Sequence, residues 1–199
     1  MNSHFRPLDL PMTTQAAEGL PRRRWSLAEI EAMVEAGVLL EDDRFELIGG
    51  EVVPMSPKGN RHELLKAALI RHWVKRAPDG ILLVPETTFR INSDTFHEPD
   101  ILFYLESDGL VKLKPATAQF VVEIADTSLA FDLNRKARLY ASYGIRELWV
   151  IDAVSLRTHI HRNPGGEGYA SIETAGPDLE IAPLFASELA VVMGQLKLV

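Results

Sequence analysis

Two absences narrow what this chain can be: it has no cysteine and no long apolar run. Without cysteine it cannot form disulfides, Cys-ligated zinc sites or thiol nucleophiles, which fits a reducing compartment. No apolar run approaches the roughly 20 residues that span a bilayer. The N-terminal MNSHFRPLDLPMTTQ also lacks the apolar core of a signal peptide. We therefore expect a cytoplasmic protein without a membrane segment.

Basic charge is also scarce. The 21 Lys and Arg residues face 28 Asp and Glu residues, which gives a net charge of −7. A general nucleic-acid binder usually carries a basic domain, so this balance counts against tight non-specific binding to phosphates. It does not exclude a nuclease, because a carboxylate metal site is itself negative. The length of 199 residues suits one globular domain. We expect an irregular arm over residues 1–24 and a single domain over 25–199.

The pattern of apolar residues predicts a sheet flanked by helices. Ser26 and Glu29 form a capping-box pattern that begins a helix, and Gly37 ends it. Helical spacing of apolar residues predicts two further helices, over 58–76 and 129–143. Short apolar runs predict strands over 81–84, 88–91, 100–104, 119–125 and 147–152. Turn residues between apolar runs predict hairpins around 49–50 and 163–166.

The strand over 119–125, the helix after it and the strand over 147–152 form a βαβ unit, whose two strands are expected to be parallel. The expected fold class is α/β (α+β), with a mixed β-sheet flanked by helices and an N-terminal helical extension. The apolar final segment, 180–199, is expected to cover the sheet, with a dimer contact as the alternative.

Three charged residues stand in or beside the predicted core elements. Asp100 lies in EPDILFY, Glu123 lies in FVVEIADTS, and Lys136 lies on the helix that follows. Lone charges on buried strands are costly unless something compensates them. Mg²⁺ prefers oxygen ligands, commonly one or two carboxylates with water and substrate phosphate. A lysine nearby can stabilise the anion that develops. The three residues therefore predict a metal-dependent phosphodiesterase site.

A structural interpretation of the same residues stays open. Asp100 could cap the start of its strand, and Glu123 could pair with a core arginine. Lys136 could lie on the solvated face of its helix. Asp132, four residues before Lys136, is expected to form a surface ion pair with it. The alternative is that Asp132 orients the lysine within the site.

The ordered fragments resemble a known nuclease family. Between about Arg44 and Asp152 the chain carries FELIGGEVVPMSP, a helix with a histidine near its start, EPDILFY, VVEIADTS and DLNRKARLYASYGIRELWVID. In this order the fragments resemble the Uma-two family of the PD-(D/E)XK nuclease superfamily. The resemblance implies a restriction-endonuclease-like core. It also implies divalent-metal-dependent cleavage of nucleic acid, with DNA as the expected substrate and Mg²⁺, or Mn²⁺ in its place, as the ion.

The resemblance also implies roles for individual residues. Asp100 matches the acid of the PD element and Glu123 matches the second acid. Both would bind the metal, together with the backbone carbonyl of Ile124. The superfamily places a lysine two positions after the second acid, and this chain departs from that pattern with Ala125. In the Uma-two pattern the following helix supplies the lysine, which is Lys136 here.

Glu46 and His62 are candidate additional site residues. Glu46 matches an acid near the family's first hairpin; the alternative is a residue at the hairpin edge. His62 stands near the start of the second helix, where the family often has a histidine; the alternative is polar packing or a surface imidazole. His97 precedes the PD element and could approach substrate. His159 and His161 share one strand face, but without a third ligand nearby a structural place is expected for both.

The expected function is that of a metal-dependent endonuclease hydrolysing phosphodiester bonds in DNA. One alternative is a catalytically silent nuclease-fold protein that serves as an oligomeric interaction or nucleic-acid-binding module. Another is a nucleotide hydrolase built on the same site. The sequence contains neither a P-loop nor a GxSxG elbow. A homodimer is expected, because two sites would cut both strands and most oligomers are symmetric.

Overall fold

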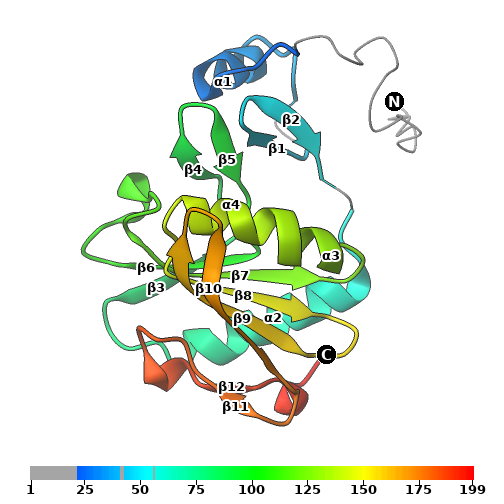
Figure 1. Cartoon of the computed structure of the whole chain (residues 1–199), viewed down its shortest axis with the longest axis vertical. Coiled ribbons are helices and arrows are strands. Elements are labelled where there is room, and N and C mark those ends of the chain that lie inside the picture. The colour runs from blue at the N-terminus through cyan, green and yellow to red at the C-terminus, as the bar shows by residue number, and fades with distance from the viewer. Residues whose placement is uncertain (1–21, 41–42, 56) are drawn as a thin grey trace.

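A six-stranded mixed sheet forms the body of the protein (Figure 1). The computed structural model describes residues 22–40, 43–55 and 57–199, so most of the arm expected over 1–24 lies outside the described residues. We call this body sheet the main sheet. Its order is β10-β9-β8-β7-β6-β3, with β3 (Ile81–Pro85), β6 (Ile101–Leu105), β7 (Ala118–Ala125), β8 (Glu147–Asp152), β9 (Thr158–Gly165) and β10 (Gly168–Ala175).

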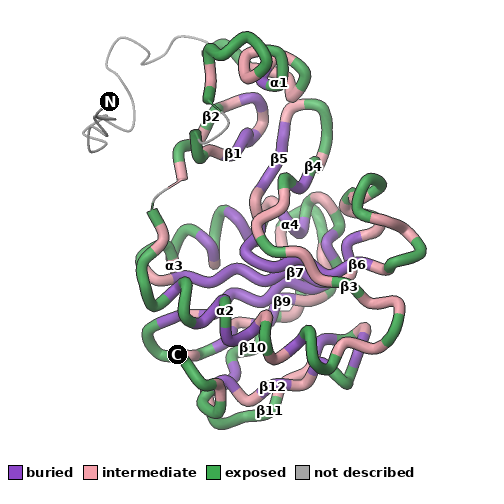
Figure 2. Tube along the Cα trace, turned by 180° about the vertical axis from the view of Figure 1, so that it is seen from behind, coloured by how far each residue is buried: buried purple, intermediate pink, exposed green. Residues whose placement is uncertain are grey.

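The two central strands of the main sheet, β7 and β8, are parallel, and the other neighbours are antiparallel. This confirms the βαβ unit predicted from the sequence. Figure 2 shows β7 as a nearly continuous buried trace. Continuous burial explains its apolar sequence, because a strand covered on both faces cannot alternate polar and apolar residues.

Helices cover both faces of the main sheet. Helix α2 (Asn60–Val74) packs on one face through Leu65, Leu69 and Trp73. The other face is covered by one continuous helical segment made of α3 (Leu129–Phe131), a π-helical turn (Asp132–Lys136) and α4 (Ala137–Ser142). No helix among the described residues is long and apolar enough to cross a bilayer.

A smaller unit, which we call the small lobe, stands on the side of the main sheet that carries α4 (Figure 1). It has its own apolar cluster and a four-stranded sheet of order β2-β1-β5-β4. Its elements are α1 (Leu27–Glu35), β1 (Phe45–Ile48), β2 (Glu51–Pro54), β4 (Phe89–Asn92) and β5 (Thr95–His97). The predicted capping box of Ser26 and Glu29 begins α1, and Gly37 follows its end with a φ of 67°.

The C-terminal segment covers the lower part of the α2 side (Figure 1). It contains the short strands β11 (Glu180–Ile181) and β12 (Val191–Val192) and two 3₁₀ turns. Leu189, Val191 and Met193 are buried in the same apolar cluster as α2. The expectation that this segment covers the sheet is confirmed.

The structure departs from the predicted elements in four places. Strand β5 was not expected, because it is only three residues long. The spacing of apolar residues over 58–76 predicts that Leu64 shares the buried face of α2, but Leu64 is 40% exposed and Lys66 is buried instead. A π-helical turn interrupts the predicted third helix. The last hairpin turns after Gly165, so that Pro164 belongs to β9.

Candidate active site

Asp100 and Glu123 lie side by side on one face of the main sheet, where β6 begins and β7 ends. Ile101 is opposite Val122 in the antiparallel β6–β7 pair. Continuing this register by one residue places Asp100 opposite Glu123, and side chains of directly opposed residues interact. Each of the two acids is only 4% exposed. The two predicted acids therefore meet in a buried place, beneath the small lobe.

Three donors hold Asp100. The Ile124 N–H donates to Oδ2 at 2.7 Å, and the Lys58 ammonium donates to Oδ1 at 2.6 Å. His62 Nε2 lies 3.0 Å from Oδ1. Burial alone would raise the pKa of Asp100, but His62 and Lys58 outweigh it and lower that pKa. Asp100 is thus an ionised carboxylate with a partner on each oxygen, and His62 is neither solvent-facing nor isolated.

Glu123 is held on one oxygen only. Lys136 Nζ lies 3.0 Å from Oε1, and the Tyr140 hydroxyl donates to the same atom at 2.6 Å. Within the part of the chain that the structure describes, nothing donates to Oε2. Burial raises the pKa of Glu123 to about 8, with repulsion from Asp100 adding to the effect and Lys136 opposing it. Glu123 therefore has both an open oxygen and excess negative charge around it.

Lys136 is buried in the site by the helix that follows β7. It ends the π-helical turn, and Tyr140 lies one α-helical turn further along, so both side chains face β7. At 7% exposure, Lys136 is not on a solvated helix face. Asp132 is not the expected surface residue either: it is 5% exposed and accepts a hydrogen bond from the Ser128 hydroxyl. The π-helical turn changes the i,i+4 geometry on which that expectation rested.

The small lobe contributes Glu46, from β1, and His97, from β5, to the candidate site. Glu46 Oε1 lies 3.2 Å from Lys136 Nζ and accepts the Glu98 backbone N–H at 3.1 Å. His97 Nδ1 is 3.4 Å from the same oxygen, and its ring lies 5.3 Å from that of Tyr140. Neither ring nitrogen of His97 has a hydrogen-bond partner among the described residues. Lys136 thus links an acid of the main sheet to an acid of the small lobe.

A second group of charges, which sequence reasoning missed, adjoins Asp100. Lys58 Nζ is 2.6 Å from Glu86 Oε1, and Lys66 Nζ is 2.9 Å from the same oxygen. Arg44 Nη2 lies 3.5 Å from it. Burial opposes ionisation of Glu86, but the two lysines bring its pKa to about 2. One signal could have pointed here: Lys66 lies next to Leu65 in the apolar stripe of α2, an unusual place for an isolated charge.

His159 and His161 have structural places, as expected. The His161 ring packs against that of Tyr169 at 5.6 Å, and its Nδ1 is 3.2 Å from the His159 carbonyl. His159 Nδ1 is 3.0 Å from the Thr174 hydroxyl. Neither belongs to the carboxylate site.

The donor set of the site fits a small hard cation. Asp100 and Glu123 supply carboxylate oxygens on adjacent strands, and Glu123 keeps Oε2 open. Among the residues described, no cluster of three or more His, Cys, Asp and Glu side chains is arranged to hold a metal. Mg²⁺ often takes only one or two protein carboxylates and keeps several waters, so the oxygens of Asp100 and Glu123 fit this ion.

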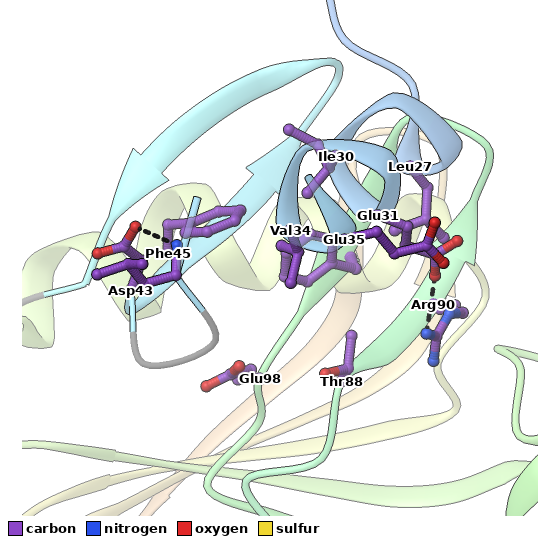
Figure 3. A pocket seen from close by; sticks show the side chains of 12 residues that line it. Leu27, Ile30, Glu31, Val34, Glu35, Asp43, Phe45, Thr88, Arg90 and Glu98 are labelled. Atoms are coloured by element: carbon purple, nitrogen blue, oxygen red, sulfur yellow. Dashed lines mark hydrogen bonds and ion pairs between the residues drawn. The ribbon is translucent and has the colours of Figure 1, made fainter. Parts of the chain in front are cut away.

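A cavity of about 410 Å³ lies in the small lobe (Figure 3). Leu27, Ile30 and Val34 of α1 line it, and Thr88 and Glu98 lie along its lower edge in the view. Glu98 also donates its N–H to Glu46. The cavity therefore borders the site through Glu98 but does not contain the paired acids.

The mixed sheet between helices, with two acids paired across β6 and β7, defines a nuclease-like class of protein. The chain belongs to the Uma2 family, described as "Putative restriction endonuclease", whose profile matches residues 28–194. The family resemblance seen in the sequence is confirmed.

A solved structure supports the fold assignment. The chain is similar to the crystal structure of "a putative nuclease belonging to DUF820" from Anabaena variabilis ATCC 29413, with a TM-score of 0.61 and 18% identity. The alignment covers 81% of this chain and 94% of that one. A search of curated proteins gave no match. The restriction-endonuclease-like fold expected from the sequence is therefore confirmed.

Proposed function

We propose that this protein is a metal-dependent endonuclease that hydrolyses phosphodiester bonds in DNA. One observation carries the proposal: buried Asp100 and Glu123 face each other on adjacent strands, with Lys136 Nζ 3.0 Å from Glu123. Membership of a family described as restriction endonucleases supports the reaction class. Burying two acids and an ammonium together is costly for a fold, which favours a function for them.

In this proposal Asp100 and Glu123 bind a divalent cation, Mg²⁺ or Mn²⁺, with the Ile124 backbone carbonyl as a further ligand. When bound, such an ion supplies a Lewis acid that acidifies water and offsets charge on the phosphoryl group. Ile124 already contacts Asp100 through its N–H, which fixes the strand backbone against the acid.

The remaining side chains orient the acids and stabilise charge. Lys136 presents its ammonium beside Glu123 and stabilises the negative charge that develops on the phosphate in the transition state. Two further contacts fix the positions of Lys136 and Glu123. Glu46 forms an ion pair with Lys136, and the Tyr140 hydroxyl donates a hydrogen bond to Glu123. His62 holds Asp100 in the orientation in which it faces Glu123.

The assembly and location belong to the same proposal. A homodimer would bring two sites to the two strands of a duplex, and sedimentation of the purified chain would measure its mass. We expect it to act in the cytoplasm, as one domain over residues 25–199.

Calorimetric titration with Mg²⁺ or Mn²⁺ tests the metal site, with wild type beside Asp100→Asn/Glu123→Gln. These substitutions keep the side-chain shapes and remove both charges. Wild type should bind the ion and the double variant should not, at matched folding by circular dichroism. Glu173→Gln, an exposed acid on β10, is the matched control and should bind as wild type does.

Cleavage assays on plasmid DNA, RNA and free nucleotides then separate the candidate functions. Plasmid cleavage that each of Asp100→Asn and Glu123→Gln abolishes would support the endonuclease. Hydrolysis of free nucleotides with plasmid untouched would favour a nucleotide hydrolase. Lys58 pairs with Asp100 and Lys136 pairs with Glu123. Because each acid thus has a counter-charge from the protein itself, the catalytically silent module is the second candidate. Metal binding and cleavage absent from wild type would support that candidate.

A further inference from the structure

Lys58 occupies an unusual position beside the candidate metal site. Its ammonium lies 2.6 Å from Asp100 Oδ1 and 2.6 Å from Glu86 Oε1, and its side chain is 11% exposed. It extends from the coil just before α2. A positive charge therefore already stands where one of the two paired acids would meet a metal ion.

The two acids differ in what an incoming cation would meet. Glu123 keeps Oε2 open among the described residues, so a cation could join it without displacing a donor. On Asp100 both oxygens are in use, Oδ2 by the Ile124 N–H and Oδ1 by Lys58 with His62 close by. A divalent ion at Oδ1 would stand next to the Lys58 ammonium, and like charges at such a separation repel strongly.

Of the three groups around Asp100, the Lys58 ammonium is the one that can move away from the carboxylate. The Ile124 N–H is fixed in β7, and His62 is fixed on α2. Lys58 has a long side chain on a coil, and it has a second acceptor in Glu86. If its bond to Asp100 were broken, the ammonium would keep Glu86 as a partner, so it would not be left buried and unpaired.

We propose that Lys58 is a built-in counter-ion that neutralises Asp100 in the metal-free protein and competes with the divalent cation for Oδ1. This inference rests on the proposed function, since it requires a metal at Asp100 and Glu123. Metal affinity is then set by displacement of Lys58 as well as by the two acids. Lys58 thus acts through Asp100, as a positioning residue.

The test is calorimetric titration of the full chain with Mn²⁺ alone. Lys58→Met and Lys58→Gln should bind Mn²⁺ about ten- to a hundredfold more tightly than wild type, the factor expected for losing a charged hydrogen bond that competes. Lys58→Arg retains the charge and should stay close to wild type. Circular dichroism confirms folding, and two neutral variants guard against one that fails to fold.

Lys66→Met is the matched control. Lys66 is equally buried and shares the Glu86 oxygen, but it does not contact Asp100. Its loss removes a nearby positive charge but no donor from Asp100, so Mn²⁺ affinity should change far less than in the neutral Lys58 variants. An equal gain in Lys66→Met would overturn the specific role of Lys58.

The outcomes separate this inference from the proposed function. If wild type binds Mn²⁺ and Asp100→Asn does not, yet Lys58→Met binds no more tightly than wild type, the counter-ion role is overturned and the metal site stands. If no protein binds Mn²⁺, including both neutral Lys58 variants, the inference and the metal-dependent function fail together. If Lys58→Met and Lys58→Gln bind Mn²⁺ more tightly than wild type while Lys58→Arg and Lys66→Met do not, the result supports the counter-ion role and the metal site together.

Discussion

At the scale of single residues, Lys136 is the charge on which two buried acids depend. It pairs with Glu123 at 3.0 Å and with Glu46 at 3.2 Å. Lys136→Met would leave Glu46 as a buried carboxylate without its ammonium, while Glu123, whose pKa is raised, can take up a proton. Breaking a buried ion pair in this way costs about 3–5 kcal/mol. Urea unfolding at neutral pH should show this loss in the free energy of unfolding. Adding Glu46→Gln should recover part of it, and an unchanged unfolding midpoint in Lys136→Met would refute the pairing.

Glu46 gives the protein a specific dependence on acid. Burial would raise its pKa, but Lys136 and His97 bring it down to about 2 from 4.5. A lowered pKa means that the stabilisation is present above about pH 4.5 and is lost as the pH falls through about 2. Wild type should thus exceed Glu46→Gln by about 3 kcal/mol near neutral pH, and the difference should shrink in acid. Unfolding by urea across this pH range measures the difference, and a constant gap would contradict the assignment.

At the scale of elements, Trp73 joins α2 to the C-terminal segment. Its indole N–H donates to the Leu189 carbonyl at 2.8 Å, and its ring packs against Phe103 at 5.4 Å. Trp73→Phe leaves that carbonyl without its donor and opens a space in the core, so it should lower the free energy of unfolding by about 2–3 kcal/mol. Val74→Ala, at an exposed position on the same helix, should change it by less than about 0.5 kcal/mol. Equal effects of the two substitutions would contradict this role of Trp73.

The sequence predicts an element well when the element's own residues show how it is buried. Strand β7 is apolar throughout, because both of its faces are covered. Strand β5 could not be predicted, since it has three residues and pairs with β1 only at Leu47 and Phe96. The π-helical turn has no sequence signal that distinguishes it from an α-helix, and so the burial of Asp132, its first residue, could not be predicted.

The candidate site likewise contains residues that the sequence could identify and residues that it could not. Asp100 and Glu123 could be found because an acid in an apolar run is unusual, and the family resemblance added Lys136 and Glu46. Lys58 and Glu86 could not be found, since each lies in a polar coil and only the fold brings them to Asp100. Glu86 also has a φ of 49°, a left-handed conformation that is uncommon for a residue other than glycine.

At the scale of the whole molecule, the candidate site joins the main sheet to the small lobe, two units that Figures 1 and 2 show as separate sheets. The chain passes between the two sheets three times: after β2, between β3 and β4, and between β5 and β6. Glu46 closes the site from the lobe side, and Asp100, Glu123 and Lys136 are at most 7% exposed. These side chains are almost fully covered in this arrangement, so the proposed endonuclease activity predicts that the lobe moves away from the sheet when a nucleic-acid strand binds.

The lack of cysteine makes this movement measurable, because introduced thiols are the sole sites for spin labels. Val52→Cys on β2 and Val154→Cys after β8 place labels at exposed positions on the lobe and on the body. With Mg²⁺ and a DNA oligonucleotide bound, the distance between these labels should increase, as double electron–electron resonance would report. Labels at Val154 and Ile172 both lie on the body and should keep their distance. Binding seen by fluorescence anisotropy without any change in the lobe–body distance would refute the opening, because the buried acids would then be reached through some other path.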